Sequence, residues 1–569
     1  MEKNDEFNSY AGFTIGPIYE VLSSARKTRE LWFGSYFFSW FMEKIIENIC
    51  NNDNYVRDGE IKFLSPYIKF PFVETNSAIG KYHDRFIIGS TLDKDALFNI
   101  INDATKSTLD YFVDLIDATV NGVGANYISD TEKNAMEKLL SWYIQRNFLV
   151  LDKNAVDESK VVKVINSYLD SMEENRTLET GINDKTCFVC KALPAVIQTT
   201  IWVKEPGVVE SESKEKDLCP LCFLKYHSLS NNKVIKKIGK RGCFKYPSVL
   251  DISAVDLLTD KVREIIESKF RDEDYEFYDI AEAYKEAHKG TEYDIGNADS
   301  LLKKPYLKYF VIVQADGDNL GKVLDKYKDH SEVPLKFSKP LFDFAGEAGR
   351  IIEQFRGYPV YIGGDDILAF APVAIKDGDG KTKTVIDLAI DLSSAYKCIV
   401  GGNNPETNLS VGMNIAYYKF PLSRALKNAR EEVYKAKSGG KNALSLLFTK
   451  HSGHQEGFKF KFNSTDIIYF SSLLSKTLAG EINFPHTLHH NLYRFKELIA
   501  QVPDKCRLNA FFDNNFNEPI HSELYSGGIE EIRDYFSAVM FDCRPDDRLK
   551  CIESILSKLA FIKFLRGEE

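Results

Sequence analysis

Apolar and polar positions between residues 305 and 446 alternate in a way that predicts a domain of mixed strands and helices. Apolar runs of strand length lie at residues 308–315, 358–372 and 409–417, and apolar residues recur at helical spacing in residues 319–328, 335–356, 385–399 and 422–437. Glycines and aspartates interrupt the second run, so it is expected to fold as a β-hairpin. The order strand, helix, helix, hairpin, helix, strand, helix is that of the palm domains of polymerases and nucleotide cyclases.

A shorter version of this pattern begins the chain. A strand is predicted at residues 13–15, and apolar residues follow at helical spacing on both sides of a charged cluster at 26–30. Strands at 61–72 and 85–88 and a helix at 97–115 complete the order of a ferredoxin-like unit. The charged cluster alone indicates no more than two packed helices with a solvated junction. This unit has no acidic strand end that resembles Asp316 or Asp365 of the second unit, so we expect a palm without catalytic residues.

Four cysteines between these two units have the spacing of a metal site. Two Cys-x-x-Cys pairs, Cys187/Cys190 and Cys219/Cys222, are separated by 28 residues. Each pair places two thiolates on one tight turn, and a tetrahedral zinc site needs two such turns. We expect structural zinc here, because four protein ligands leave no position for a reacting water. The alternative is a set of buried thiols without metal.

The remaining regions carry helical patterns, so we predict an α+β protein in four parts. These are a degenerate palm-like domain (1–185), a zinc-binding and helical linker domain (186–300), a catalytic palm (301–450) and a helical carboxy-terminal domain (451–569) with no strand run of note. His486, His489 and His490 lie in the last part, but no cysteine or carboxylate stands beside them at zinc spacing, so they are not expected to bind metal.

The predicted hairpin carries the candidate chemistry. Gly363-Gly364-Asp365-Asp366 lies between two apolar runs, which indicates a tight turn with carboxylates at its tip. Asp316 follows an apolar strand 49 positions upstream. Strands that end side by side in one sheet would bring these carboxylates together. They could then hold two divalent ions, Mg²⁺ or Mn²⁺, roughly 3.5–4 Å apart, as phosphoryl and nucleotidyl transfer require.

Two lysines follow the last predicted helix of this domain. Lys437 and Lys441 flank a glycine-rich turn, where they could neutralise triphosphate charge. The plainer interpretation is an ordinary helix carboxyl terminus whose dipole attracts cations. Within a palm domain the phosphate role is favoured. A lone Gly-Gly-Asp-Asp is likewise most often a simple turn, and the upstream Asp316 makes the pattern more specific.

Composition and charge fit a protein with several domains. The 569 residues are 44% hydrophobic and 27% charged, which is ordinary for a globular protein of roughly three or four domains. The net charge of −10 disfavours a freestanding nucleic-acid-binding protein. The polar amino terminus, the apolar run at residues 31–42, which is too short to span a bilayer, and the ten cysteines predict a cytoplasmic protein without membrane contact or a disulfide framework.

Together these segments resemble the large subunit of type III-B (Cmr) CRISPR-Cas effector complexes. The resemblance rests on GPIYEVLSSARKTRELWFGSYFFS near the start, on the paired Cys-x-x-Cys motifs, and on ADGDNLGKVL, YIGGDDILAF and LSVGMNIAYYKFPLSRALKNAREEVYKAKSGGKNAL. It covers most of residues 10–450. The carboxy-terminal region fits by position and helical character only.

The resemblance implies an RNA-activated nucleotidyltransferase. In this family, binding of target RNA guided by crRNA switches on the palm, which makes adenylate second messengers from ATP, usually cyclic oligoadenylates. Other Cmr-type subunits complete the complex. The resemblance assigns the metals to Asp316, Asp365 and Asp366 and the nucleotide to Gly317, Gly363, Gly364, Ser338, Lys437 and Lys441.

One departure from the family concerns its DNA-cutting HD domain. The first histidine of the sequence is His83, followed by Asp84, and an HD site needs a further histidine upstream. We therefore expect no DNase activity. Relatives without an HD domain are thought to join AMP to an acceptor such as S-adenosylmethionine, which remains an alternative product. A catalytically silent scaffold and a freestanding diguanylate-type cyclase are the other hypotheses, and the complete carboxylate set and the paired palms disfavour them.

Overall fold

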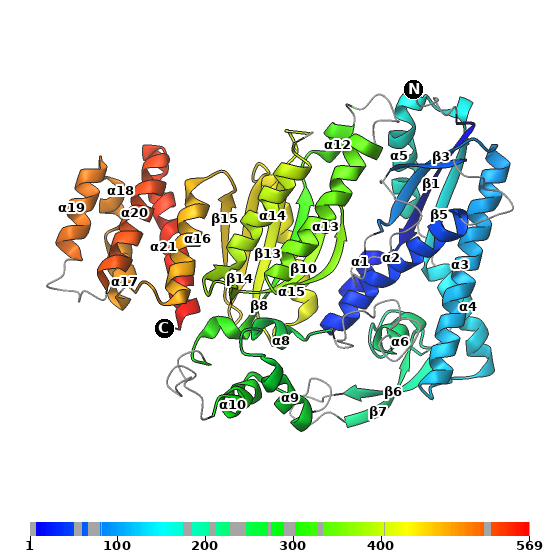
Figure 1. The fold of residues 1–569 in the computed structure, drawn as a ribbon, viewed down its shortest axis with the longest axis horizontal. Coiled ribbons are helices and arrows are strands. Elements are labelled where there is room, and N and C mark those ends of the chain that lie inside the picture. Colours follow the sequence, from blue (N-terminus) through cyan, green and yellow to red (C-terminus); the bar gives the residue numbers. More distant parts are fainter. Residues whose placement is uncertain are drawn as a thin grey trace.

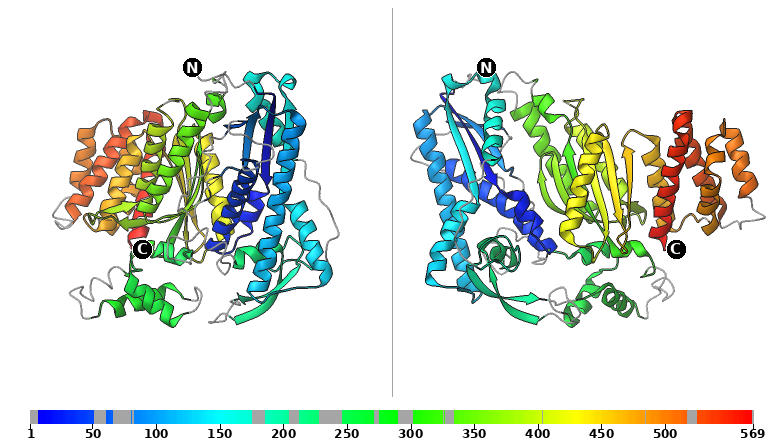
Figure 2. Two further views of the ribbon diagram at one scale, coloured as in Figure 1. Left: turned by 45° about the vertical axis from the view of Figure 1, so that its right-hand side comes forward. Right: turned by 180° about the vertical axis from the view of Figure 1, so that it is seen from behind.

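The computed structural model describes most of the chain and contains two palm sheets, of which the second lies near the centre (Figures 1 and 2). The described residues are 7–50, 60–65, 80, 82–174, 185–203, 212–227, 246–270, 275–289, 302–324, 326, 334–402, 404–483, 485–516 and 525–567. The first palm lies at one end of the long axis, and the carboxy-terminal helices lie at the other. No helix of the described residues is both long and apolar enough to cross a membrane.

The first palm is the ferredoxin-like unit that the sequence predicts. Its sheet has the order β2-β3-β1-β5, with strands β1 Ser9–Gly16, β2 Ile61–Ser65, β3 Arg85–Ser90 and β5 Gln145–Asp152. Helices α2 Thr28–Cys50 and α3 Lys94–Gly122 cover one face, and α5 Val161–Glu174 covers the other. The predicted strand at 61–72 extends only to Ser65 among the described residues, and 66–72 lie outside them.

Helix α2 forms the centre of the first core. Its apolar residues surround the helix, so it is buried on nearly all sides, with Trp32, Phe37 and Trp40 each 2% exposed. A helix that is apolar all round packs inside a domain. The preceding helix α1 Ile18–Ser23 and the charged junction at residues 26–30 run toward the cysteine region.

The cysteine region is a small three-stranded sheet with one helix. Strands β4 Asn126–Tyr127, β6 Ile197–Val203 and β7 Glu212–Leu218 pair in the order β4-β6-β7, and α6 Pro220–His227 follows. The helices α8 Val249–Ser253, α9 Asp260–Lys269 and α10 Phe277–Ala287 then lead to the second palm. They confirm the helical character predicted for the described part of residues 248–300.

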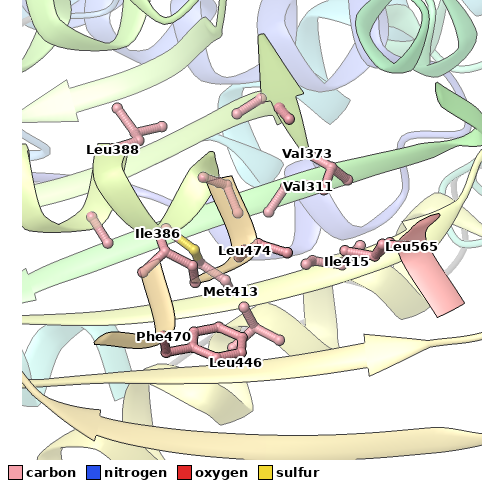
Figure 3. Close-up of a cluster of buried hydrophobic side chains, with 14 of the residues drawn as sticks. Val311, Val373, Ile386, Leu388, Met413, Ile415, Leu446, Phe470, Leu474 and Leu565 are labelled. Atoms are coloured by element: carbon pink, nitrogen blue, oxygen red, sulfur yellow. The ribbon is translucent and has the colours of Figure 1, made fainter. Parts of the chain in front are cut away.

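The second palm contains a six-stranded sheet with helices on both faces. The strand order is β15-β14-β13-β8-β10-β9. Strands β13 Leu409–Tyr417, β8 Tyr309–Gly317 and β10 Asp366–Pro372 lie inside the sheet, and β9 Tyr358–Gly363 forms one edge. Helices α13 Lys339–Gln354 and α14 Val385–Ile399 pack on one face, and α15 Leu422–Ser438 packs on the other. Figure 3 shows part of the core on the α14 side, where Met413 lies beside Ile386 and Ile415 lies beside Leu565.

Two details of the predicted helices differ from the structure. The helix expected at 319–328 is described only as the short α12 Leu320–Leu324. The one expected at 335–356 begins as a π-helical turn, Pro334–Ser338, before α13 starts. A small hairpin, β11 Ala374–Lys376 and β12 Thr382–Thr384, precedes α14.

The expectation that residues 451–569 contain no strand is wrong for one segment. Strand β15 Gln455–Lys461 pairs with β14 Ala443–Thr449 and forms the outer edge of the palm sheet. Its alternation is short, with Phe458 and Phe460 buried and Lys459 exposed, as on an edge strand with one solvated face. The position of the domain boundary itself stays a prediction.

The rest of the carboxy-terminal region is helical, as predicted. Helices α16 Thr465–Ala479, α20 Ser526–Asp542 and α21 Arg548–Arg566 pack against the second palm and against each other, and α17 His486–Arg494, α18 Lys496–Ala500 and α19 Lys505–Asn515 complete the group. Cys543 and Cys551 form a disulfide in this structure, which the expectation of reduced cysteines did not include. His489 contacts the Leu556 carbonyl rather than a metal-ligating group.

Candidate active site at the palm hairpin

The glycine-aspartate segment forms the tight hairpin that the sequence predicts. Asp366 pairs with Gly363 across β9 and β10, so Gly364 and Asp365 alone make the turn. Gly364 has a φ of +75°, a left-handed value at the first of the two turn positions. A two-residue turn with glycine at that position matches the right-handed twist of the strands it joins.

The sheet brings the upstream carboxylate to the same place. Strand β10 pairs with β8 so that Ile367 lies opposite Ala315, which leaves Asp366 and Asp316 at adjoining strand ends. Asp365 lies over the end of β8, where the Gly317 backbone N–H stabilises its charged form. A side chain at Gly317 would meet the Tyr396 hydroxyl at 2.7 Å and Asp365 Cβ at 2.9 Å, so only glycine allows this close approach. The structure therefore places the three aspartates at adjoining strand ends, and their joint binding of metal stays a prediction.

Burial and mutual repulsion disfavour the charged form of these carboxyl groups. Surrounding protein atoms, and the nearby Asp316, raise the pKa of Asp365 to about 6. The same desolvation, together with Asp365, Asp316 and Asp84, raises the pKa of Asp366 to about 8, although the residue as a whole is exposed. Carboxylates whose pKa rises through burial and mutual repulsion form a site that a cation would stabilise.

Lys437 already supplies one positive charge to this site. Its Nζ lies 2.6 Å from Asp316 Oδ2 and donates to the Gly317 carbonyl at 3.3 Å. The lysine is the last charged residue of α15, so the helix carries its ammonium group to the end of β8. The donor set of three carboxylates and a carbonyl suits hard divalent cations such as Mg²⁺. The three carboxylates are not gathered tightly, however: among the described residues, only the cysteine cluster brings three or more ligand side chains close enough to hold a metal ion.

The turn after α15 is fixed by a residue that the sequence did not single out. Asp318 is 1% exposed, and its carboxylate accepts hydrogen bonds from Ser410 Oγ and from the Asn442 N–H, each at 2.9 Å. Lys441 and Asn442 both have positive φ, and Lys441 Nζ donates to Asn319 Oδ1 at 2.6 Å. The second aspartate of the Asp-Gly-Asp-Asn motif was the available signal, because it is two positions beyond a metal candidate.

The other predicted nucleotide contacts lie close to the site but are covered. Gly363 and Gly364 are buried, the first under the Tyr361 ring and the second under His83. The contact of these two glycines with a nucleotide therefore stays a prediction. Ser338 is 3% exposed at the start of α13, so its hydroxyl is not open to solvent either.

The four cysteines come together as predicted. One ligand atom from each of Cys187, Cys190, Cys219 and Cys222 lies within 4.8 Å of the others. Lys191 has a φ of +57° and donates its N–H to the Cys187 carbonyl, which closes the first tight turn. Hydrogen bonds from Cys187 and Cys219 lower the pKa of the Cys190 thiol well below its usual range. Thiolates in this arrangement are the ligands of tetrahedral zinc.

Comparison with known proteins gives family matches in both palms. Residues 309–445 match the second palm domain of Cas10/Cmr2, and residues 10–116 match the amino-terminal domain of the CRISPR-associated protein Cmr2. The CRISPR system Cmr subunit Cmr2 of Pyrococcus furiosus is 22% identical over an alignment that covers 82% of this chain and 64% of the relative. The chain thus spans about two thirds of that relative's length.

Two solved structures share the fold along the whole chain. They are a type III-B Cmr-beta complex in the apo state and the same type of complex bound to cognate target RNA. Each matches with a TM-score of 0.60 at 13% identity and covers 100% of this chain, and the match includes 82% and 84% of the solved chain, respectively. At this identity the likeness concerns the fold.

Proposed function

The chain belongs to the Cas10/Cmr2 family, as a large subunit of the type III-B kind, and on this premise we propose that it is an RNA-activated nucleotidyltransferase. The observation that carries the proposal is the placement of Asp316 beside Asp365 and Asp366 at adjoining strand ends, with Lys437 as a counter-ion. A catalytically silent scaffold would gain nothing from mutually repelling carboxylates at adjoining strand ends, so this arrangement favours the hypothesis that the chain is an enzyme.

In the proposed reaction the three aspartates hold two Mg²⁺ or Mn²⁺ ions. When bound, such ions activate the attacking hydroxyl and neutralise the developing charge on the phosphates. Lys437, which pairs with Asp316 in this structure, would contact a phosphate oxygen of the bound nucleotide. Lys441, held at the glycine turn by Asn319, is the second phosphate contact. Gly317 keeps Asp365 against the end of β8, so the site is assembled before substrate arrives.

The proposed substrate is ATP, and the proposed product is a cyclic oligoadenylate. Transfer of AMP to a non-nucleotide acceptor such as S-adenosylmethionine is the alternative product of the same metal site, because both reactions need the same attack on the α-phosphate. The carboxylates and lysines serve either acceptor. Product analysis therefore has to accompany any turnover assay.

The proposed partners are crRNA, target RNA and other Cmr-type subunits in the cytoplasm. One solved relative with this fold is a Cmr-beta complex bound to cognate target RNA. The net charge of −10 makes extensive RNA binding by the isolated chain unfavourable, so contact through partner subunits or a local patch is expected. For the cysteine cluster we propose zinc, bound by four thiolates and serving to hold the turns of β6, β7 and α6 together.

The test is ATP turnover by the assembled complex. The complex is incubated with target RNA, Mg²⁺ or Mn²⁺ and labelled ATP, with and without S-adenosylmethionine. Wild type and the control Asp379→Asn, an exposed acid on the distant β11–β12 hairpin, should turn over ATP, while Asp365→Asn plus Asp366→Asn should not. No turnover by wild type under any condition would refute the enzyme. Labelled single-stranded DNA in the same reaction tests the expected lack of DNase activity.

A further inference from the structure

A short segment of the first palm lies against the catalytic hairpin of the second. Gly80 forms a parallel bridge with Tyr361, and its carbonyl accepts a hydrogen bond from the Ile362 N–H at 3.4 Å. The same segment is fastened to its own domain, because the Tyr82 N–H donates to Ser39 Oγ at 2.8 Å and the Asp84 carbonyl accepts from the Ile15 N–H at 2.8 Å. We call Gly80 and residues 82–84 the strap.

Within the strap, His83 contacts the turn residue of the hairpin. A Cβ placed on Gly364 would lie 3.2 Å from His83 Cε1 and 3.3 Å from Nε2, so the imidazole occupies the space beside this glycine. Leu341 of α13 packs against the same point, with its Cβ 3.4 Å away. The left-handed Gly364 is therefore contacted by one ring from the first palm and one side chain from the second.

The turn needs such support because it carries repelling charges. Asp365 is one of its two residues and has no partner in the strand ladder, while Asp366 begins β10. Both face Asp316 across the end of β8, so repulsion between the carboxylates tends to spread the hairpin tip. A displacement of about 1 Å at reacting groups can lower a rate by roughly a hundredfold.

We propose that His83 is a positioning residue for the nucleotidyl-transfer site. Its ring packs on Gly364 and fixes the turn, so that Asp365 and Asp366 stay beside Asp316 and can share the metal ions. This role rests on the proposed function of the palm. It also gives the first palm a direct part in assembling the catalytic centre of its neighbour.

The alternative is a half-buried histidine that only fills space between two domains. Both roles predict some loss of stability when the ring is removed. Only the positioning role predicts weaker metal binding at the aspartates and recovery when the missing ring is returned, because an engineered cavity can bind a small molecule of the shape that was deleted.

The experiment compares His83→Ala, His83→Phe and the control His489→Ala in the assembled complex. His489 is a half-buried histidine of the carboxy-terminal helices, and its Nε2 contacts the Leu556 carbonyl far from the hairpin. ATP turnover is measured with and without imidazole, and Mn²⁺ binding is measured by calorimetry. We expect His83→Ala to lower kcat by about 10–100-fold with little change in the KM for ATP, and to bind Mn²⁺ more weakly. Imidazole should restore part of the rate, and His83→Phe should keep most of it.

Three results would overturn the proposal. One is a wild-type kcat and Mn²⁺ affinity in His83→Ala, and another is a loss that imidazole does not repair and that His489→Ala shares. The third is full loss in His83→Phe, which would show that a ring nitrogen rather than packing is needed. The Mn²⁺ measurement does not depend on turnover, so failure of the proposed enzyme activity and failure of the positioning role give different results.

Discussion

The ammonium group of Lys437 lies 2.6 Å from a carboxylate oxygen of Asp316. The two residues are far apart in sequence, and only the packing of α15 on the palm sheet brings them together. In the metal-free protein this ion pair offsets part of the repulsion among the three aspartates. If Asp316 were a ligand of a divalent cation, the Lys437 ammonium group would be placed to contact a phosphate oxygen instead.

The first prediction concerns the removal of this charge. Lys437→Met keeps the length of the side chain but removes the cation, so ATP loses one phosphate contact. We expect kcat/KM for ATP to fall by roughly 10–100-fold, which corresponds to about 1.4–2.7 kcal/mol of transition-state stabilisation. The control is Lys427→Met on the exposed side of α15, where the lysine pairs with Glu431. An equal loss in both variants would contradict a specific role for Lys437.

The second prediction concerns competition between protons and metal ions. The raised pKa values, about 6 for Asp365 and about 8 for Asp366, mean that both groups still hold protons below those values. Metal binds the ionised form, so the apparent Mn²⁺ affinity should increase between pH 6 and pH 8, by up to about tenfold per pH unit for one displaced proton. Above pH 8 it should level off.

The stability of the protein without metal should change with pH in the opposite direction, falling as the pH rises. A carboxyl group whose folded-state pKa is raised contributes most to folding while it is protonated, and this contribution is lost as the pH rises through about 6 and then about 8. Mn²⁺ should therefore raise the thermal midpoint more at pH 8 than at pH 6. Asp366→Asn should remove the upper part of this pH dependence. A Mn²⁺ affinity that does not change with pH would show that these carboxyls are not the ligands.

The sequence predicted the catalytic hairpin because its chemistry is local. The glycine at a left-handed turn position, the apolar runs on either side and the carboxylates between them specify a tight turn without help from the rest of the chain. The convergence with Asp316 also followed, because both segments had to end at one edge of a palm sheet. The cysteine cluster could likewise be predicted, because the spacing of its two Cys-x-x-Cys pairs is that of a metal site.

Contacts between domains could not be predicted in this way. His83 stands in the first palm, more than two hundred residues before Gly364, and no periodic pattern links the two. Strand β15 was missed because an edge strand with one solvated face has only two buried aromatic residues to mark it. Asp318 gave a visible pattern, but its burial under Ser410 and Asn442 depends on how β13 and the turn after α15 pack.

The third prediction concerns removal of the metal from the cysteine cluster. Cys222→Ser should abolish zinc binding and unfold the turns that the metal holds, because structural zinc contributes on the order of 10 kcal/mol to small domains. Cys398→Ser, at an exposed free cysteine of α14, is the control. Elemental analysis and thermal unfolding give the readout, and a purified wild type without zinc would contradict the site.

Loss of zinc should also destabilise the neighbouring helix α1 of the first palm. Lys225 lies in α6 just after Cys222, is 3% exposed, and donates to the Val21 carbonyl and to Ser24 Oγ, the latter at 3.1 Å. The lysine thereby supplies a hydrogen-bond donor to a carbonyl group near the carboxyl end of α1. Hydrogen exchange in residues 18–24 should therefore increase in Cys222→Ser and stay unchanged in Cys398→Ser.

The last prediction separates stability from positioning at Asp318. Asp318→Asn removes the negative charge and one of two acceptor oxygens, so the hydrogen bonds from Ser410 Oγ and the Asn442 N–H are weakened. The free energy of unfolding should fall by about 1–3 kcal/mol. Because Asn442 follows Lys441 in a turn of positive φ, that turn should shift and the KM for ATP should rise several-fold.

Asp377→Asn is the matched control for this change. The Asp377 carboxylate also accepts backbone hydrogen bonds in a turn, from the Asp379 N–H at 3.0 Å and the Lys381 N–H at 2.8 Å, but it lies on the β11–β12 hairpin. Its replacement should cost stability without changing the KM for ATP. If both variants lost stability equally and neither changed the KM, the buried carboxylate of Asp318 would serve the fold alone, and Lys441 would not depend on it for its position at the phosphates.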